Sequence, residues 1–239
     1  MYRRGDEPDS LNTILAQKLY WTFQCDKIGN LVTKGVSSSL SFSMKSNEHT
    51  ISYRFSNSTT RKIVDLENSI EPRASNSIFL PSREVFSQQN IILQTREVDR
   101  AFGFDETHYD LAQALTQRGH TNAFTGAREK LENLIGGRMV LDDYNRRWMF
   151  SSGNQRFCVG ATAESVRRIG TLEVLLANNY LDTNSIILID QPEAGLHPST
   201  LSTLLEIIAS LSAQGIQFFL ATSSEVALKT LRTLSHTHS

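Results

Sequence analysis

The chain has 239 residues and a formal net charge of −1, with 24 Lys and Arg against 25 Asp and Glu. This length suits one large α/β domain, or a core with a smaller lobe, and the balanced charge excludes a global basic field that would attract nucleic acid. Two widely separated cysteines, Cys25 and Cys158, argue against a disulfide framework or a zinc cluster. No apolar run approaches the ~20 residues of a membrane span, and no signal peptide is recognisable, so we expect a cytoplasmic protein.

The N-terminal third predicts a helix followed by an antiparallel hairpin. Apolar residues at helical spacing favour a helix over residues 12–23, with a turn at residues 29–30. Apolar and polar residues alternate over residues 40–44 and 51–55, which predicts a hairpin or meander with one solvated face. A short apolar strand, residues 77–80, ends at a proline.

The middle of the chain is mostly helical in pattern. Helices are expected over residues 105–117 and 125–135, and a pair of glycines ends the second one. A second hairpin is predicted from residues 138–141 and 147–150, because turn-forming residues separate them. Another helix is expected over residues 162–178.

The C-terminal third predicts alternating strands and helices. Residues 185–189 and 216–221 are apolar runs of strand length, and the first suggests a strand that is buried on both faces. Helices are expected over residues 199–212 and 224–234. A strand, helix, strand, helix order predicts a parallel sheet with right-handed crossovers.

A specific sequence follows the first of these strands. A carboxylate at the C-terminal end of a buried parallel strand lies where α/β sheets bind ligands, and four apolar residues before an Asp have the form of a Walker B motif. A strand that ends in Asp is common in itself, and the specificity comes from the continuation, Asp190-Gln191-Pro192-Glu193-Ala194-Gly195-Leu196-His197-Pro198. It resembles the Asp-Glu-Pro-Glu-(Ala/Asn)-X-Leu-His-Pro string of the ABC/SMC-like ATPases, an AAA-type group that includes the overcoming-lysogenization-defect nucleases.

The resemblance implies roles for the residues of this string. Asp190 matches the residue that binds Mg²⁺ when nucleotide is bound. Gln191 replaces the Glu that polarises the attacking water in the family. A D-loop-like stretch follows, formed by Gly195, Leu196, His197 and Pro198.

Two further segments resemble the family, each with a substitution. Ala163, Glu164 and Ser165 match the signature segment Ala-Glu-Gly, with Ser165 in place of the Gly. In the family this segment opens a helix whose N-terminus points at the γ-phosphate held by the opposite subunit. Near the C-terminus, Ser223 replaces the His of the switch strand, which would contact the γ-phosphate.

The N-terminal segment aligns with a degenerate P-loop. A P-loop wraps phosphates with backbone N–H groups, neutralises them with a Lys and binds Mg²⁺ through a hydroxyl. In a gapless alignment the first Gly is retained, while Lys and Ser are lost; the matched residues are Gly5, Ser10, Leu11, Asn12 and Thr13. Three acids between residues 6 and 9 would repel a triphosphate. Alternatively, residues 5–13 are an irregular start and the alignment is coincidental; in both cases the sequence holds no functional P-loop.

The resemblance extends over nearly the whole chain and implies its fold. We expect an α/β, P-loop NTPase-like, ABC-type nucleotide-binding domain with a mostly parallel core sheet, antiparallel hairpins and a helical lobe. It should form a single domain over residues 1–239, with the core in residues 1–80 and 138–239 and the helical lobe in residues 81–137. The family also has a strand layer before its P-loop, so we expect the central sheet to lack a strand unless a partner supplies it.

The substitutions at Leu11, Ser165, Gln191 and Ser223 favour a pseudo-ATPase that acts as an interaction or regulatory subunit without ATP hydrolysis. The implied partner is a second copy or an active ATPase paralogue, and the family also works with nucleases. No cofactor is then expected. The alternative is a switch that binds Mg-ATP and hydrolyses it weakly or not at all, with Asp190 as the Mg²⁺ ligand.

A third reading is a DNA-associated module of a defence or DNA-maintenance system. Pairs of basic residues, at 61–62, 146–147 and 167–168, and nearby aromatics could form a local patch. A solvated surface explains such pairs better at this net charge. We interpret His197 as shaping its loop, and His108, among acids at the start of a helix, as part of a turn that suits the helix dipole.

Overall fold

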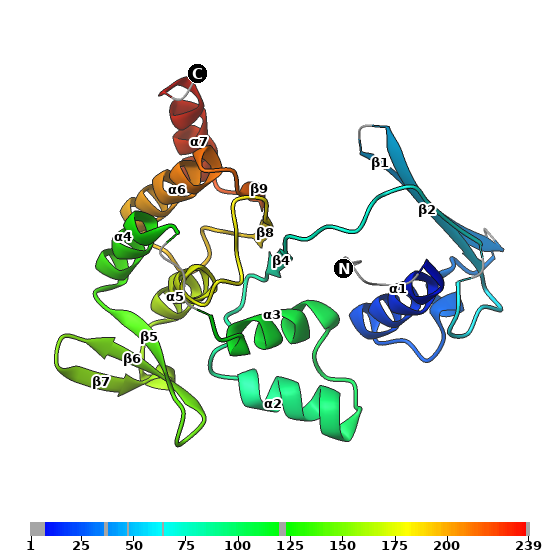
Figure 1. The fold of residues 1–239 in the computed structure, drawn as a ribbon, viewed down its shortest axis with the longest axis horizontal. Coiled ribbons are helices and arrows are strands. Elements are labelled where there is room, and N and C mark those ends of the chain that lie inside the picture. Colours follow the sequence, from blue (N-terminus) through cyan, green and yellow to red (C-terminus); the bar gives the residue numbers. More distant parts are fainter. Residues whose placement is uncertain (1–7, 36–37, 47, 64, 120–122, 238–239) are drawn as a thin grey trace. The chain divides into compact units, whose positions relative to one another are not determined.

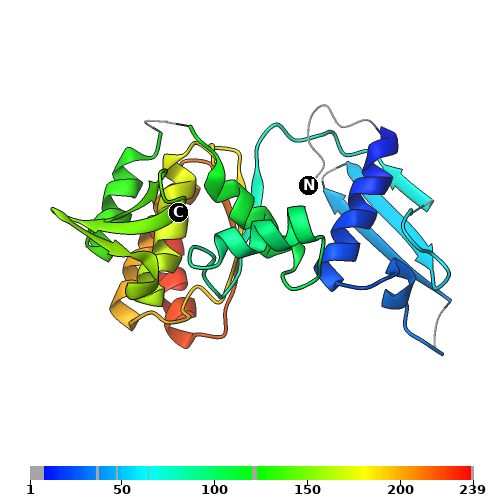
Figure 2. The same ribbon diagram turned by 90° about the horizontal axis from the view of Figure 1, so that it is seen from below.

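The computed structural model describes residues 8–35, 38–46, 48–63, 65–119 and 123–237. The chain divides into two compact units (Figures 1 and 2). Unit 1 comprises Met1–Ala74 and Ala101–Glu106, and unit 2 comprises Ser75–Arg100 and Thr107–Ser239. The expected division into a core and a helical lobe over residues 81–137 follows different boundaries and stays a prediction.

Unit 1 joins one long helix to an antiparallel sheet. Helix α1 (Pro8–Phe23) begins earlier than expected, and a 3-10 helix, Ile28–Leu31, replaces the expected turn. The predicted hairpin is confirmed as β1 (Ser39–Ser46) and β2 (His49–Ser56), and a third strand, β3 (Asp65–Asn68), pairs with β2. The sheet therefore has the order β1-β2-β3, with every neighbouring pair antiparallel.

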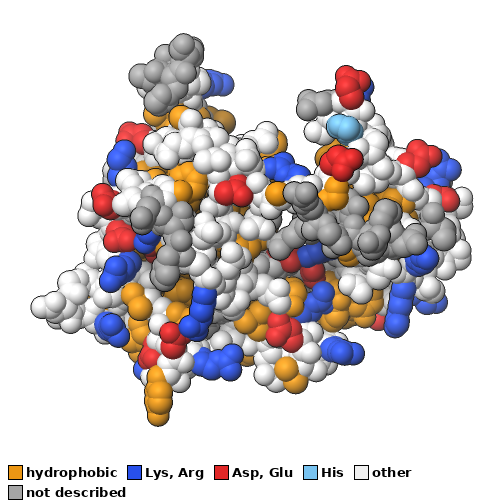
Figure 3. All heavy atoms as spheres, viewed as in Figure 1, with side chains coloured by type: hydrophobic (Ala, Val, Ile, Leu, Met, Phe, Trp, Pro, Cys, Tyr) orange, Lys and Arg blue, Asp and Glu red, His pale blue; other side chains and the backbone are white. Residues whose placement is uncertain are grey.

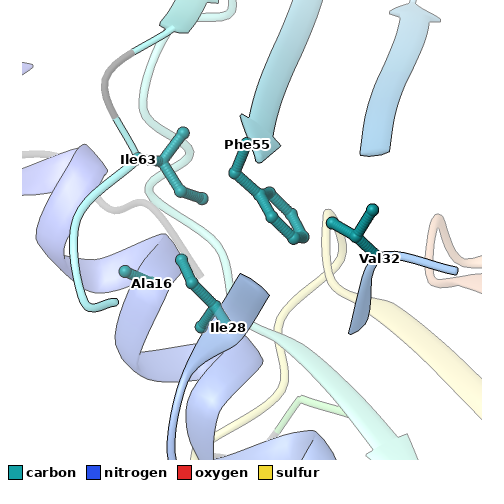
Figure 4. Close-up of a cluster of buried hydrophobic side chains, with 5 residues drawn as sticks. All are labelled: Ala16, Ile28, Val32, Phe55 and Ile63. Atoms are coloured by element: carbon teal, nitrogen blue, oxygen red, sulfur yellow. The ribbon is translucent and has the colours of Figure 1, made fainter. Parts of the chain in front are cut away.

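The core of unit 1 lies between α1 and one face of this sheet. Figure 4 shows its five buried side chains, which come from α1, the 3-10 helix region, β2 and the segment before β3: Ala16, Ile28, Val32, Phe55 and Ile63. Alternation along the strands places Leu40, Tyr53 and Leu66 against the same cluster. The opposite face carries Ser and charged side chains, as the alternation predicted.

Unit 2 contains the parallel sheet that the sequence predicted. Its order is β4 (Ser77–Leu80), β8 (Ile186–Asp190) and β9 (Gln217–Ala221), and both pairs are parallel. Helix α6 (Pro198–Ala213) connects β8 to β9, and α7 (Glu225–Thr237) follows β9, so the βαβα order is confirmed. Because parallel strands end at one edge, the carboxyl ends of β8 and β9 lie side by side.

Strand β8 departs from the expectation that both its faces are buried. Ile187 and Ile189 are buried, whereas Ile186 and Leu188 on the other face are only half-buried. In the same row as Leu188, Phe219 of β9 is 51% exposed. Helices α4, α5 and α6 lie on one side of β8 in Figures 1 and 2. This arrangement explains why only one face of β8 is fully buried.

The remaining elements of unit 2 are helices around a second antiparallel sheet. The expected helices are confirmed as α3 (Glu106–Thr116), α4 (Thr125–Ile135) and α5 (Glu164–Ala177), and a short α2 (Gln89–Gln94) continues into a π-helical turn, Thr95–Asp99. The second hairpin is β5 (Arg138–Asp142) and β6 (Arg147–Ser152). A third strand, β7 (Gln155–Cys158), pairs with β6, and a 3-10 turn, Val159–Ala161, leads into α5.

Helix α5 is the centre of unit 2. It buries eight consecutive residues, among them Leu172, Leu175 and Leu176, and it packs against α4 and β5. Burial of one Leu side chain contributes about 1.5–3 kcal/mol, so this helix anchors the unit. Its N-terminal turn projects beyond the packed part, because Ala163 and Glu164 are exposed.

Candidate functional site

The candidate site is built around the loop after β8. Asp190 is the last residue of β8 and pairs with Ala221 at the end of β9. The backbone N–H of Gln191 donates to the Ala221 carbonyl at 2.8 Å, so the chain leaves the sheet directly after Asp190. Gln191 takes a left-handed conformation with φ 48°, and its side chain is exposed. Such a conformation in a residue other than Gly is uncommon and is typical of functional turns.

Arg168 of α5 holds this loop through its backbone carbonyls. Its guanidinium donates to the Gln191 carbonyl at 2.7 Å, to the Asp190 carbonyl at 3.4 Å and to the Ala194 carbonyl. Burial lowers the pKa of Arg168, while the acids nearby raise it. Because an arginine stays charged even so, it can stabilise several carbonyls at once.

Glu193 connects the same loop to the segment after β9. Its carboxylate accepts hydrogen bonds from the Thr222 hydroxyl at 2.7 Å and from the Ser223 backbone N–H at 3.1 Å. Partial burial would raise the pKa of Glu193, but these and further backbone hydrogen bonds outweigh it, so the pKa lies below its ordinary value. These contacts place Asp190, Gln191 and Ser223 close together, while the roles that the resemblance implies for them stay predictions.

The signature-like segment forms the N-terminal end of α5. Ala163 occupies the N-cap position without a side-chain cap, Glu164 lies in the first turn, where an acid suits the helix dipole, and Ser165 is half-buried. Arg167 fixes this end of α5: its Nε lies 3.0 Å from Glu84 Oε1, and its Nη1 donates to the Thr162 carbonyl at 2.7 Å.

The D-loop-like residues form the turn into α6. Gly195 has φ 72°, a left-handed conformation that glycine adopts without strain, and Leu196 is half-buried. His197 is the N-cap of α6, where its Nδ1 accepts from the Ser199 N–H at 3.3 Å, and Pro198 occupies the first turn. His197 thus contributes to the turn into α6 through its N-cap contact, and its D-loop-like role stays a prediction.

The described residues that align with a P-loop belong to unit 1, and they form part of a helix and not a loop. Residues 8–10, expected in the loop, already belong to α1, and Gly5 lies outside the described residues. Ser10, Leu11, Asn12 and Thr13 are all in this helix. Leu11, at the position of the P-loop Lys, is 5% exposed and therefore acts as a core residue, while Thr13 is exposed.

These residues do not fit an Mg-nucleotide. A triphosphate needs a cation at its β/γ end, and α1 places the buried apolar side chain of Leu11 at the position of that cation. Within the described part of the chain, no group of three or more His, Cys, Asp and Glu side chains could hold a metal ion.

Two contributors to the site were missed from the sequence, Arg168 and Glu193. Both lie inside the segments that resemble the family, but their role depends on contacts with backbone groups that are distant in sequence. The signal that could have found them is their charge beside an otherwise apolar strand and helix.

The chain is similar to a protein family and to several solved structures. A family model described as "AAA domain, putative AbiEii toxin, Type IV TA system" matches residues 45–228. No curated protein matches the chain. An SMC head bound to the C-winged helix domain of ScpA is 12% identical, with a TM-score of 0.50, over 95% of this chain and 82% of that one. At this identity the match shows the fold alone.

Two other solved structures are more distant in shape. The SMC head domain from Thermotoga maritima is 11% identical with a TM-score of 0.38, over 80% of this chain and 66% of that one. The Pyrococcus furiosus Smc head with an extended coiled coil, bound to the C-terminal domain of ScpA, is 11% identical with a TM-score of 0.45, over 93% of this chain and 82% of that one.

No described helix has the length and apolar character needed to cross a membrane, and the expected cytoplasmic location stays a prediction.

Proposed function

Because the chain belongs to the AAA-domain family whose model matches residues 45–228, with the α/β P-loop NTPase-like fold of SMC heads, we propose that it is a pseudo-ATPase. It serves as an interaction or regulatory subunit and does not hydrolyse ATP. The observation that carries this proposal is Leu11: the position that aligns with the phosphate-binding Lys is a buried apolar side chain in α1. Loss of this charge and of the general base at Gln191 would each lower a hydrolytic rate by orders of magnitude.

A hydrolysis assay with Mg-ATP tests the proposal. We expect no turnover above background for the wild-type protein. We also expect none for Gln191→Glu, because the restored carboxylate would still lack a P-loop cation. Turnover by the wild type that disappears in Asp190→Asn would disprove the proposal. Turnover that Asp190→Asn leaves unchanged would come from a contaminant.

One observation favours the alternative of an ATP-binding switch. Asp190 is retained at the end of β8, where a carboxylate can bind Mg²⁺ beside a nucleotide. Calorimetry with ATP and Mg²⁺ separates the two functions. Micromolar binding that is lost in Asp190→Asn would support the switch, and no binding at millimolar ATP would support the pseudo-ATPase.

The partner that we propose is a second copy of this chain or an active ATPase paralogue, with a nuclease as a further candidate. The exposed start of α5, with Ala163 and Glu164, supports this proposal, because a free helix N-terminus can face an anion on another subunit. The similar SMC head is itself bound to a protein domain.

Light scattering across a concentration series tests self-association. If the chain dimerises through this surface, Ser165→Arg should shift the equilibrium to the monomer, because it places a bulky cation at the positive end of α5. The exposed substitution Glu129→Arg on α4 is the control for added charge. A monomer at every concentration would exclude the second copy and leave the paralogue.

A further inference from the structure

A hollow in unit 2 lies apart from the loop after β8, between the end of α3, helix α5 and strand β5. Its volume is about 410 Å³. Apolar side chains line part of it, including Leu115, Met139 and Val174. A space of this size, with an apolar wall and a few charged groups, has the character of a site for a small organic molecule.

The charged groups around this hollow are mostly cationic. Arg118, Arg128 and Arg138 line it together with two acids, Asp143 and Glu173. Arg118 is paired with Asp143 at 2.5 Å. Arg128 Nη2 lies 3.4 Å from Glu173 Oε1 and 3.7 Å from Glu132 Oε1, whereas Arg138 is exposed and forms no ion pair within the described part of the chain. Among the described residues, Arg138 is therefore the guanidinium group of this wall that has no carboxylate within salt-bridge distance.

Glu173 is a buried acid in the wall of the hollow, and its protonation state changes the net charge there. Its side chain is 2% exposed, so it acts on an occupant through its charge and through Arg128. The pair is incomplete, because Glu173 Oε2 and Arg128 Nε both lack a hydrogen-bond partner among the residues that the structure describes. Burial raises the pKa of Glu173 to about 7, although Arg128 opposes this shift, and Glu132 adds to it. Near neutral pH the carboxyl group is thus divided between its charged and neutral forms.

We propose that this hollow binds a small organic oxyanion with an aromatic or aliphatic body, and that Arg128 and Arg138 hold the anionic group. Guanidinium groups form strong, often bidentate, hydrogen bonds with oxyanions, and the apolar wall takes the organic body. When Glu173 is neutral, Glu132 is the one carboxylate that still pairs with Arg128 among the described residues, so more of the positive charge of Arg128 acts on a bound anion.

The other charged groups near Glu173 come from every neighbouring element. Arg128 and Glu132 lie on α4, Arg138 on β5, Arg118 after α3 and Asp143 in the turn after β5. The arginines stay charged throughout the neutral range. The carboxyl group of Glu173 therefore changes its charge between about pH 6 and about pH 8, and binding should be tighter at the lower value.

Calorimetric titration with benzenesulfonate tests the site, because the charge of this probe is constant over the range and phenol is its neutral counterpart. We expect saturable binding of benzenesulfonate and none of phenol. Arg138→Gln, at an exposed position, should weaken the binding about tenfold, which corresponds to the loss of one charge-assisted contact. Arg156→Gln, an exposed arginine on β7, is the matched control and should leave the affinity unchanged.

Glu173→Gln tests the role of the buried carboxyl group. The variant should bind at about pH 8 as tightly as the wild type binds at about pH 6, and its affinity should no longer depend on pH. Absence of saturable binding at millimolar benzenesulfonate would overturn the proposal. Equal affinity of the wild type and Arg138→Gln would also overturn it, because the probe would then occupy another place. Circular dichroism of each variant verifies that it is folded.

Discussion

At the scale of single residues, Arg168 explains how a strand end becomes a fixed loop. Three backbone carbonyls, those of Asp190, Gln191 and Ala194, converge on one guanidinium group. Two of these contacts are part-buried, and a carbonyl removed from water without a partner costs free energy, so the three hydrogen bonds offset the desolvation of the guanidinium group. The left-handed conformation of Gln191 persists within this arrangement.

Arg168→Ala should therefore destabilise unit 2 and loosen the loop after β8. Loss of hydrogen bonds to a charged donor, with carbonyls left unpaired, costs about 2–4 kcal/mol. Urea denaturation gives the free energy of unfolding, and hydrogen exchange of the amides in residues 191–196 reports the loop itself. Arg156→Ala on β7 is the control, because this side chain is exposed. Unchanged exchange in Arg168→Ala would show that the loop is held by other contacts.

At the scale of elements, the sequence predicted those helices and strands that have an apolar face. Helix α4 was predicted with its observed bounds, because Leu131 and Ala127 follow helical spacing and Gly136, with φ 72°, ends it. Strand β7 was missed because all four of its residues are exposed, so no apolar alternation marks it. Its pairing with β6 is a backbone property that no pattern of side chains shows.

The turn between α6 and β9 depends on Gly215. Its φ of 109° is unsuited to L residues, and an added Cβ would lie 2.4 Å from the Thr183 carbonyl oxygen. Gly215→Ala should therefore cost about 2 kcal/mol or more, because a clash with backbone is added to the strain. Thermal denaturation checks this expectation. Gly160→Ala is the matched control, since an added Cβ there meets nothing within 4 Å; equal effects of both substitutions would contradict the argument.

The contact between α4 and α5 should make stability depend on pH through Glu173. Burial raises the pKa of this group to about 7 from 4.5, so the folded state binds its proton more strongly than the unfolded state does. The stabilisation is present below the unfolded pKa and is lost as pH rises through the folded value, and it amounts to about 3 kcal/mol. The free energy of unfolding of the wild type should fall relative to that of Glu173→Gln as pH rises from about 4.5 to about 7, and denaturation of both proteins across this pH range measures the difference. Parallel curves would show that Glu173 is ionised throughout.

At the scale of the whole molecule, the sequence predicted the family and the residues after β8 better than their surroundings. The string from Asp190 to Pro198 can be recognised because its spacing is specific, whereas the contacts of Glu193 with Thr222 and Ser223 join segments 29 and 30 residues apart. The conformation of residues 8–10 was also beyond the sequence. Residues 8–10 contain no glycine of the kind that allows the tight turn of a P-loop, and α1 extends through them.

The division into two units predicts that each unfolds with its own stability. The two tryptophans report on them separately, since Trp21 belongs to unit 1 and Trp148 to unit 2. In a Trp21→Phe protein, the fluorescence of Trp148 follows unit 2 alone. Phe55→Ala removes a core side chain of unit 1 and should leave this transition in place, whereas Leu175→Ala in α5 should lower its free energy of unfolding by about 2–5 kcal/mol. If Phe55→Ala shifted the Trp148 transition as much as Leu175→Ala does, the chain would unfold as one cooperative body.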